Sequence, residues 1–329
     1  MYYLRKTALI SLIGLAIYVI AGKEGFANGM VNNNASGIVA GRIIQNTSDS
    51  SINSVNVGSI RGNNSRNNRV SGHIIGDIKQ QARDKSSNNL NVGSARNGSN
   101  NSANGYIGGN VKQQAQQRSS NQASIGSTNR GSQNLANGAV NGNINQNASQ
   151  KSSNSALVGS VGQGSNNYAN GYVGGNVRQD AQAESRNIAQ VGSVASGSNN
   201  IASGYVSGDI IQTATNGSSN SSMVGSVGSG NNNSAFGGVN GNISQDAQGR
   251  SQTSIVVGSV QSGSNKSSYG YVDGDISLSA SGNSHNSIHV GSSSLTNNQG
   301  FNSNTVVMGD IRVVTSGNRD FRLRVGSND

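Results

Sequence analysis

Branched apolar residues alternate with other residues on both sides of a recurring glycine. Two positions before this glycine, and again two positions after it, the residue is always Val or Ile. The first set is Val39, Ile74, Ile107, Val140, Val173, Val206, Val239, Val272 and Val307. The second set is Ile43, Ile78, Val111, Ile144, Val177, Ile210, Ile243, Ile276 and Ile311. Alternation by two with β-branched residues predicts a β-strand that packs one face against a core.

A second strand is predicted around a Val/Ile-Gly-Ser triplet that recurs along the chain, mostly every 33 residues. Its glycines are Gly58, Gly93, Gly126, Gly159, Gly192, Gly225, Gly258 and Gly291. Two thin strands cannot shield their own apolar face, whereas stacked copies place like side chains above one another. The sequence therefore predicts an all-β fold, a repetitive parallel β-solenoid or stacked β-arch of cross-β type, with two strands in each 33-residue repeat. The glycines are expected to allow sharp turns or a close approach of the two strands.

A glutamine occupies one fixed position in seven repeats, four residues after the first kind of glycine. These residues are Gln45, Gln80, Gln113, Gln146, Gln179, Gln212 and Gln245. Identical amide side chains in register can hydrogen-bond along a stack, as they do in cross-β assemblies. We expect the seven glutamines to form a structural ladder.

The C-terminal repeats depart from this pattern. Leu278 and Val313 replace the glutamine, and the run NTVVMGDIRVV is the most apolar one after the first residues of the chain. A stack of strands has an open edge at each end, which either recruits another molecule or must be blocked. The arginines around this run are therefore candidate docking residues: Arg312, Arg319, Arg322 and Arg324.

Composition argues against a conventional globular core. Of 329 residues only 32% are hydrophobic and 4% are aromatic, while 47 are glycine. Such a composition is usual in disordered chains, which bury too little apolar surface to offset the entropy of ordering. The strict repeat favours order instead, and the complete lack of proline agrees with strands that need every backbone N–H. With no cysteine, disulfides cannot contribute.

The first residues have the features of an export signal. Arg5 and Lys6 precede an apolar stretch from Thr7 to Gly22, and small residues end at Ala27. The alternative is an uncleaved anchor, but a helix of this length spans only about 24 Å of a hydrocarbon core about 30 Å thick. We expect a signal peptide at 1–27, an incomplete first repeat at 28–52, seven repeats of about 33 residues at 53–285, and a divergent C-terminal repeat and cap at 286–329.

Charge suggests partners of a general kind. The net charge is +10, and most of the excess cations lie between residues 28 and 120. A basic half favours non-specific contact with anionic polysaccharide, lipopolysaccharide or extracellular DNA. The alternative is that charge keeps a low-complexity chain soluble before it assembles.

Catalytic and metal-binding patterns do not emerge. His73, His285 and His289 occupy different repeat positions, without companion ligands at metal-binding spacing. Asp residues at 77, 209, 275 and 310 share their repeat position with asparagines, which dilutes like-charge repulsion along a stack. We expect no enzyme activity, no metal and no cofactor.

The chain resembles two known protein families. The segments GSNNSA (98–103), GSNNYA (164–169), GSNNIA (197–202) and GNNNSA (230–235), with NVKQQA and NVRQDA, are similar to the repeats of curlin and related subunits of secreted bacterial amyloid fibres. That resemblance implies a secreted subunit that assembles with copies of itself into cell-surface fibres or biofilm matrix, with an outer-membrane export or nucleator protein as partner.

The second resemblance leads to a different function. NSALVGS and TSIVVGS resemble the head repeats of trimeric autotransporter adhesins, which are also β-solenoids. The alternative function is therefore a non-polymeric surface adhesin that binds host or abiotic surfaces. The C-terminal residues GNRDFRLRVGSND show neither coiled-coil heptads nor a row of barrel strands.

Overall fold

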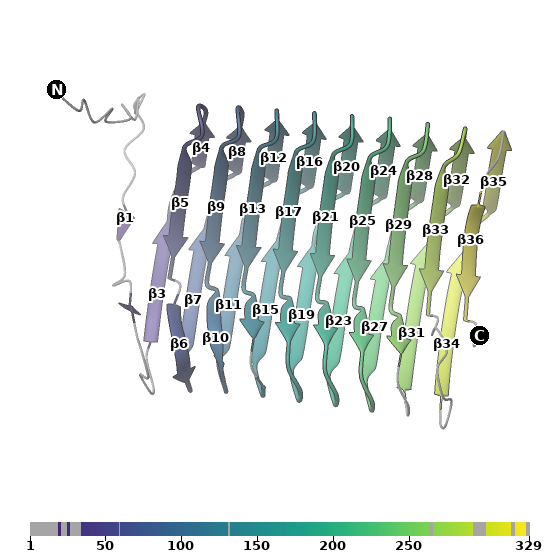
Figure 1. Cartoon of the computed structure of the whole chain (residues 1–329). Coiled ribbons are helices and arrows are strands. Elements are labelled where there is room, and N and C mark those ends of the chain that lie inside the picture. The colour runs from purple at the N-terminus through teal and green to yellow at the C-terminus, as the bar shows by residue number, and fades with distance from the viewer. Residues whose placement is uncertain are drawn as a thin grey trace.

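The computed structural model describes residues 19–20, 25–26, 34–58, 60–130, 132–262, 266–291, 301–316 and 320–326. These residues form a β-solenoid, in which the chain winds around one straight axis (Figure 1). The predicted all-β parallel solenoid with a 33-residue repeat is confirmed. Within the described ranges no helix is long and apolar enough to cross a membrane.

Four sheets run along the axis. Each circuit of the chain, called a rung below, contributes one strand to each of sheets A, C and D, and the rungs from β3 to β30 also contribute one to sheet B. Sheet A contains β1 (Val19–Ile20), β3 (Asn34–Val39), β7 (Arg69–Ile74), β11 (Ser102–Ile107), β15 (Leu135–Val140), β19 (Tyr168–Val173), β23 (Ile201–Val206), β27 (Ser234–Val239), β31 (Lys266–Asp273) and β34 (Phe301–Met308). Sheet C contains β4 (Ile43–Thr47), β8 (Ile78–Ala82), β12 (Val111–Gln116), β16 (Ile144–Ser149), β20 (Val177–Gln182), β24 (Ile210–Thr215), β28 (Ile243–Gln248), β32 (Ile276–Ser281) and β35 (Ile311–Ser316).

The other two sheets complete each rung. Sheet D contains β5 (Ile52–Val57), β9 (Ser87–Val92), β13 (Ser120–Ile125), β17 (Ser153–Val158), β21 (Arg186–Val191), β25 (Ser219–Val224), β29 (Gln252–Val257), β33 (His285–Val290) and β36 (Asp320–Val325). Sheet B contains β2 (Gly25–Phe26), β6 (Ile60–Arg66), β10 (Ala95–Ser99), β14 (Thr128–Arg130), β18 (Val161–Gln163), β22 (Val194–Ser196), β26 (Val227–Ser229) and β30 (Val260–Ser262).

A rung therefore has four short strands, in the chain order A, C, D, B, where the sequence predicted two. Each predicted strand is divided by a corner at its own glycine. One corner lies between β11 and β12 at Gly109, and the other lies between β13 and β14 at Gly126, whose φ is +57°. A third corner, at Gln117 and Arg118, uses two consecutive residues with positive φ. Alternation by two continues across a corner in the sequence, so it could not reveal where the strand ends.

Neighbouring rungs pair in parallel and in strict register. Ser102 to Ile107 of β11 pair residue by residue with Leu135 to Val140 of β15, and the same offset recurs in sheets C and D. There are two exceptions: β1 pairs antiparallel with β3, and the pairing of β10 with β6 shifts register between Arg96 and Gly98. Identical repeat positions are thereby placed directly above one another, at the spacing of about 4.8 Å that separates paired strands.

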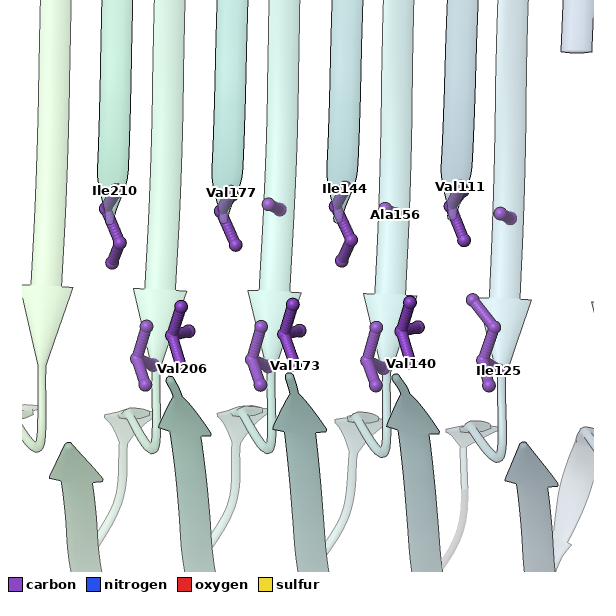
Figure 2. Packing of buried hydrophobic residues seen from close by; sticks show 14 of the residues in the cluster. Val111, Ile125, Val140, Ile144, Ala156, Val173, Val177, Val206 and Ile210 are labelled. Atoms are coloured by element: carbon purple, nitrogen blue, oxygen red, sulfur yellow. The ribbon is translucent and has the colours of Figure 1, made fainter. Parts of the chain in front are cut away.

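The core consists of columns of Val and Ile that face the axis from sheets A, C and D (Figure 2). Ile107, Val111 and Ile125 supply one layer of this core, and each is fully buried. Burying one such side chain contributes about 1.5–3 kcal/mol. A smaller cluster of Ala and Val, including Ala136 and Val161, fills the space between sheets A and B. A narrow core thus extends along the whole stack, although few residues of the chain are apolar.

Most of the predicted signal peptide, 1–27, lies outside the described residues. Two pieces of it are described: β1 pairs with β3, and β2 pairs in parallel with β6. These contacts occupy the outer edges of the first rung in sheets A and B.

Candidate functional site

The seven predicted glutamines form one column in the interior, on the inward face of sheet C. All are at most 3% exposed. From Gln80 onward, each Nε2 donates to Oε1 of the glutamine one rung earlier, at 2.7–3.0 Å. The same Nε2 also donates to a backbone carbonyl of sheet D; for Gln179 this is Ser221 O, at 3.2 Å. Both amide hydrogens are satisfied, so the column joins rung to rung and sheet C to sheet D.

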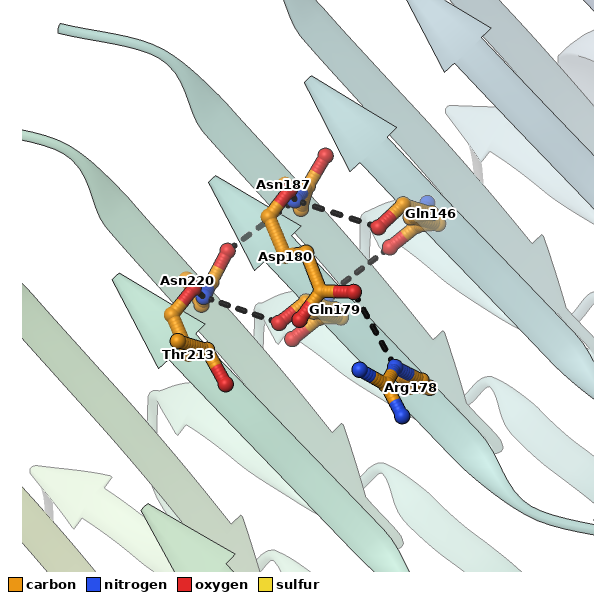
Figure 3. A network of polar contacts seen from close by, with 7 residues as sticks. All are labelled: Gln146, Arg178, Gln179, Asp180, Asn187, Thr213 and Asn220. Atoms are coloured by element: carbon orange, nitrogen blue, oxygen red, sulfur yellow. Dashed lines mark hydrogen bonds and ion pairs between the residues drawn. The ribbon is translucent and has the colours of Figure 1, made fainter. Parts of the chain in front are cut away.

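A second amide column stands beside the first, and the sequence analysis missed it. Its members on sheet D are Asn88, Asn121, Asn154, Asn187 and Asn220. Asn187 Nδ2 donates to Asn220 Oδ1 at 3.1 Å and to the backbone oxygen of Asp180 at 2.7 Å, and Figure 3 shows the two columns together. An asparagine five residues before the Val/Ile-Gly-Ser glycine was the sequence signal for this column.

The repeat glycines form the corner between sheets D and B. From Gly58 to Gly291 their φ angles lie between +54° and +61°. A Cβ at Gly159 would lie 1.6 Å from Asn170 O of sheet A, so no other residue fits. A facing glycine column in sheet A, represented by Gly138 and Gly171, lets this corner approach closely, since a Cβ at Gly138 would lie 2.2 Å from Gly159 N. These glycines both turn the chain and permit close contact.

The Asp and Asn residues at the corner between sheets A and C bond one rung to the next. Asp77 Oδ1 accepts the backbone N–H of Asn110 at 2.8 Å, and Asp209 Oδ1 accepts that of Asn242 at 2.7 Å. In the part of the chain that the structure describes, no group of three His, Asp or Glu side chains stands close enough to hold a metal ion. His73 instead packs against Tyr106, with ring centroids 4.5 Å apart.

The amide ladder ends before the C-terminal rung. Leu278 follows Gln245 in register and is 1% exposed, and Val313 follows Leu278. Gln245 Oε1 is buried without a hydrogen-bond partner because Leu278 offers no donor. Leu278 belongs to the apolar core, and Val313 packs against it.

The last rung exposes apolar residues that every inner rung buries. Ile311 is 47% exposed and Val325 is 40% exposed, whereas their counterparts one rung earlier, Ile276 and Val290, are fully buried. Among the described strands, β34, β35 and β36 each have a partner on one side only. This end combines unpaired backbone edges with an apolar surface, as an interface for another β-rung would.

Three of the predicted docking arginines lie on this rung, Arg322 and Arg324 on the same face of β36. Arg312 is exposed on β35 and Arg322 is exposed on β36, while Arg324 is half-buried. Arg319 lies outside the described residues.

Among known protein families, curated proteins and solved structures, none matches this chain.

Proposed function

We propose that this protein is a secreted structural subunit that stacks end to end with copies of itself, forming extracellular fibres or biofilm matrix at the bacterial cell surface. The chain is a repetitive β-solenoid, which is a structural scaffold. The observation that carries the proposal is the open C-terminal rung, where Ile311 and Val325 face solvent beside unpaired strand edges. The export-like first residues and the curlin-like repeats support the same function.

The first rung supplies a matching surface for the last one. β4 and β5 are edge strands, and β3 and β6 pair on their outer side only with β1 and β2. Both of these partners lie within residues 1–27, so cleavage after Ala27 would remove them and open the whole first rung. A second copy could then continue the solenoid with the parallel pairing that already joins every inner pair of rungs.

Electron microscopy of purified residues 28–329 tests this proposal. Incubation at micromolar concentration should yield unbranched fibres, with a growing protease-resistant fraction and a β-sheet spectrum. A protein that stays monomeric for days under these conditions would contradict it.

The alternative is a non-polymeric surface adhesin, and the aromatic side chains on the outer face of sheet A favour it. Tyr168, Tyr172 and Phe236 are 40–43% exposed on this face. Binding of stable monomer to host or abiotic surfaces in an adhesion assay would support the alternative. In either function, the basic N-terminal half would add non-specific contact with anionic polysaccharide, lipopolysaccharide or DNA, and an outer-membrane protein would contact the C-terminal arginines.

A further inference from the structure

The aromatic residues of the solenoid are gathered on one face. Between residues 34 and 291, every Tyr and Phe belongs to sheet A and occupies a position that faces outward. They are Tyr106, Tyr168, Tyr172, Tyr205, Phe236, Tyr269 and Tyr271. The core does not need them, since Val, Ile, Leu and Ala fill it. A chain with so few aromatic residues that places them on one outer face indicates a surface that contacts something.

A slot interrupts one column of these rings. His73, Tyr106, Ala139, Tyr172 and Tyr205 are register partners in successive rungs. The rings of His73 and Tyr106 pack together, and those of Tyr172 and Tyr205 stack with centroids 6.0 Å apart and planes 7° apart. Between the two pairs stands only the methyl group of Ala139. Tyr106 and Tyr172 lie two rungs, about 9.6 Å, apart along the axis, which leaves room for one ring between them.

The slot is part of a cavity of about 250 Å³ with a polar wall. Its lining includes Tyr106, Ala139 and Tyr172, together with the asparagine column at 104, 137 and 170. Asn137 Nδ2 donates to Asn104 Oδ1 at 2.9 Å, and Asn170 Nδ2 donates to Asn137 Oδ1 at 3.1 Å. These bonds use one hydrogen and one lone pair of the Asn137 amide, so a second donor and a second acceptor remain for a ligand.

The strands on either side of the slot present no Asp, Glu, Lys or Arg on this face: the outward residues of β11, β15, β19, β23 and β27 include none. At one end of the cavity β7 contributes His73, and the same face of β7 carries Arg69. An uncharged site with aromatic walls and an amide edge fits a ligand with apolar ring faces and hydroxyl groups around its rim.

From this geometry we infer that the slot over Ala139 holds one sugar ring of an uncharged polysaccharide. A ring between Tyr106 and Tyr172 has its plane perpendicular to the solenoid axis, so the polysaccharide chain crosses sheet A at right angles to that axis. The sugar's C–H faces contact Tyr106 and Tyr172, and its hydroxyls bond to Asn137. A second copy of this chain fits less well, because the recess and the amide wall interrupt the apolar strip that a dry contact requires. This inference rests on the proposed extracellular location, since that is where such a polymer would be met.

The variant Ala139→Tyr tests the slot without removing any contact residue. The register places the new ring between Tyr106 and Tyr172, where it fills the recess and extends the tyrosine column, and cross-strand aromatic pairs favour the sheet. Binding of cellohexaose to residues 28–329 is measured by titration calorimetry. End-to-end stacking leaves the outer face of sheet A exposed, so the measurement does not depend on the assembly state. Loss of two ring contacts should weaken binding by about tenfold or more.

Two controls keep the result specific. Ala139→Ser leaves the slot open, and Asn145→Tyr adds a tyrosine to the outer face of sheet C instead. Both should bind cellohexaose within about twofold of the unmodified protein. Circular dichroism verifies that all three variants keep the solenoid.

The inference would be overturned if the unmodified protein did not bind cellohexaose at millimolar concentration, or if Ala139→Tyr bound it undiminished. Equal affinity of the unmodified protein for hexagalacturonate would also overturn it, as would an Ala139→Tyr variant that changed self-association alone. Electron microscopy of the same variants reports fibre formation separately. Failure of sugar binding is therefore distinguishable from failure of the proposed fibre function.

Discussion

Strands β34, β35 and β36 of the C-terminal rung continue sheets A, C and D of the inner rungs, yet the same repeat position has a different environment in each. Ile144 is fully buried between two neighbouring rungs, whereas Ile311 has a neighbour on one side and is 47% exposed. In a solenoid each repeat contacts only adjacent repeats, so interfaces supply most of its stability. The last rung lacks one of these interfaces, and another copy of the chain would restore it.

The two regions also differ in the chemistry of the ladder position. Gln179 bonds to Gln146, and Gln212 bonds to Gln179, at 2.7 Å each. Val313 occupies the corresponding place in the last rung. A buried amide left without a partner is costly, whereas an apolar side chain tolerates both exposure and later contact. The end is thus suited to associate and dissociate in a way that an exposed amide ladder is not.

The largest effect is expected from charging the inner ladder. Gln113→Glu, Gln146→Glu and Gln179→Glu together place three carboxylates in a buried column, and each costs several kcal/mol without a cation. Since whole domains are stable by only about 5–15 kcal/mol, the triple variant should lose its β-sheet circular dichroism at neutral pH. The control is a triple variant that adds the same three negative charges at exposed positions of sheet C: Gln116→Glu, Gln182→Glu and Gln248→Glu. This variant should stay folded. A folded ladder variant would show that the interior tolerates charge.

A smaller difference is expected between two glycines with the same backbone conformation. In Gly159→Ala the new Cβ meets Asn170 O, so the cost should reach about 3 kcal/mol or more. At Gly326 the φ is also near +60°, but the nearest atom to a Cβ is Thr305 Oγ1 at 3.2 Å. Gly326→Ala should therefore cost only about 1 kcal/mol. Urea unfolding followed by circular dichroism measures both, and equal losses would contradict the close contact at the inner corner.

The smallest effects are expected from truncating two isoleucines that occupy the same repeat position in the core. Ile144→Ala leaves a cavity between two rungs and should cost about 3 kcal/mol, whereas Ile311→Ala should cost roughly 1 kcal/mol in the monomer. Thermal unfolding at concentrations below those of assembly gives the two values. If Ile311→Ala were as destabilising as Ile144→Ala, the end rung would be as well packed as the interior.

Much of this fold was predictable because one-dimensional stacking turns a sequence period directly into contacts. The columns of Val, Ile and Gln could be read from their spacing of 33 residues, without knowledge of the path around each rung. The four-strand rung could not be read from the spacing. The alternation of inward and outward residues continues through the corners at Gly109 and Gly126, so it does not show that a strand ends there. The asparagine column was visible in the same spacing, although Thr253 interrupts it.

The candidate sites were harder to predict than the fold. The exposure of Ile311 and Val325 depends on a missing neighbour, which a repeat pattern does not reveal. The slot over Ala139 exists only because register brings Tyr106 and Tyr172 to either side of a small residue. A residue that departs from the repeat pattern, such as Ala139, can be interpreted only when its neighbours in the folded chain are known.

The central claim is that copies associate through the open rung, and the variant Ile311→Lys with Val325→Lys tests it most directly. Its control is Ile44→Lys with Ile75→Lys, which charges two isoleucines that are each 59% exposed on the sides of the solenoid. Fibre growth from residues 28–329 is followed by light scattering and electron microscopy at equal concentrations. The account predicts that the end variant remains monomeric with an intact β-sheet spectrum while the control forms fibres. Equal fibre growth by both variants would contradict it.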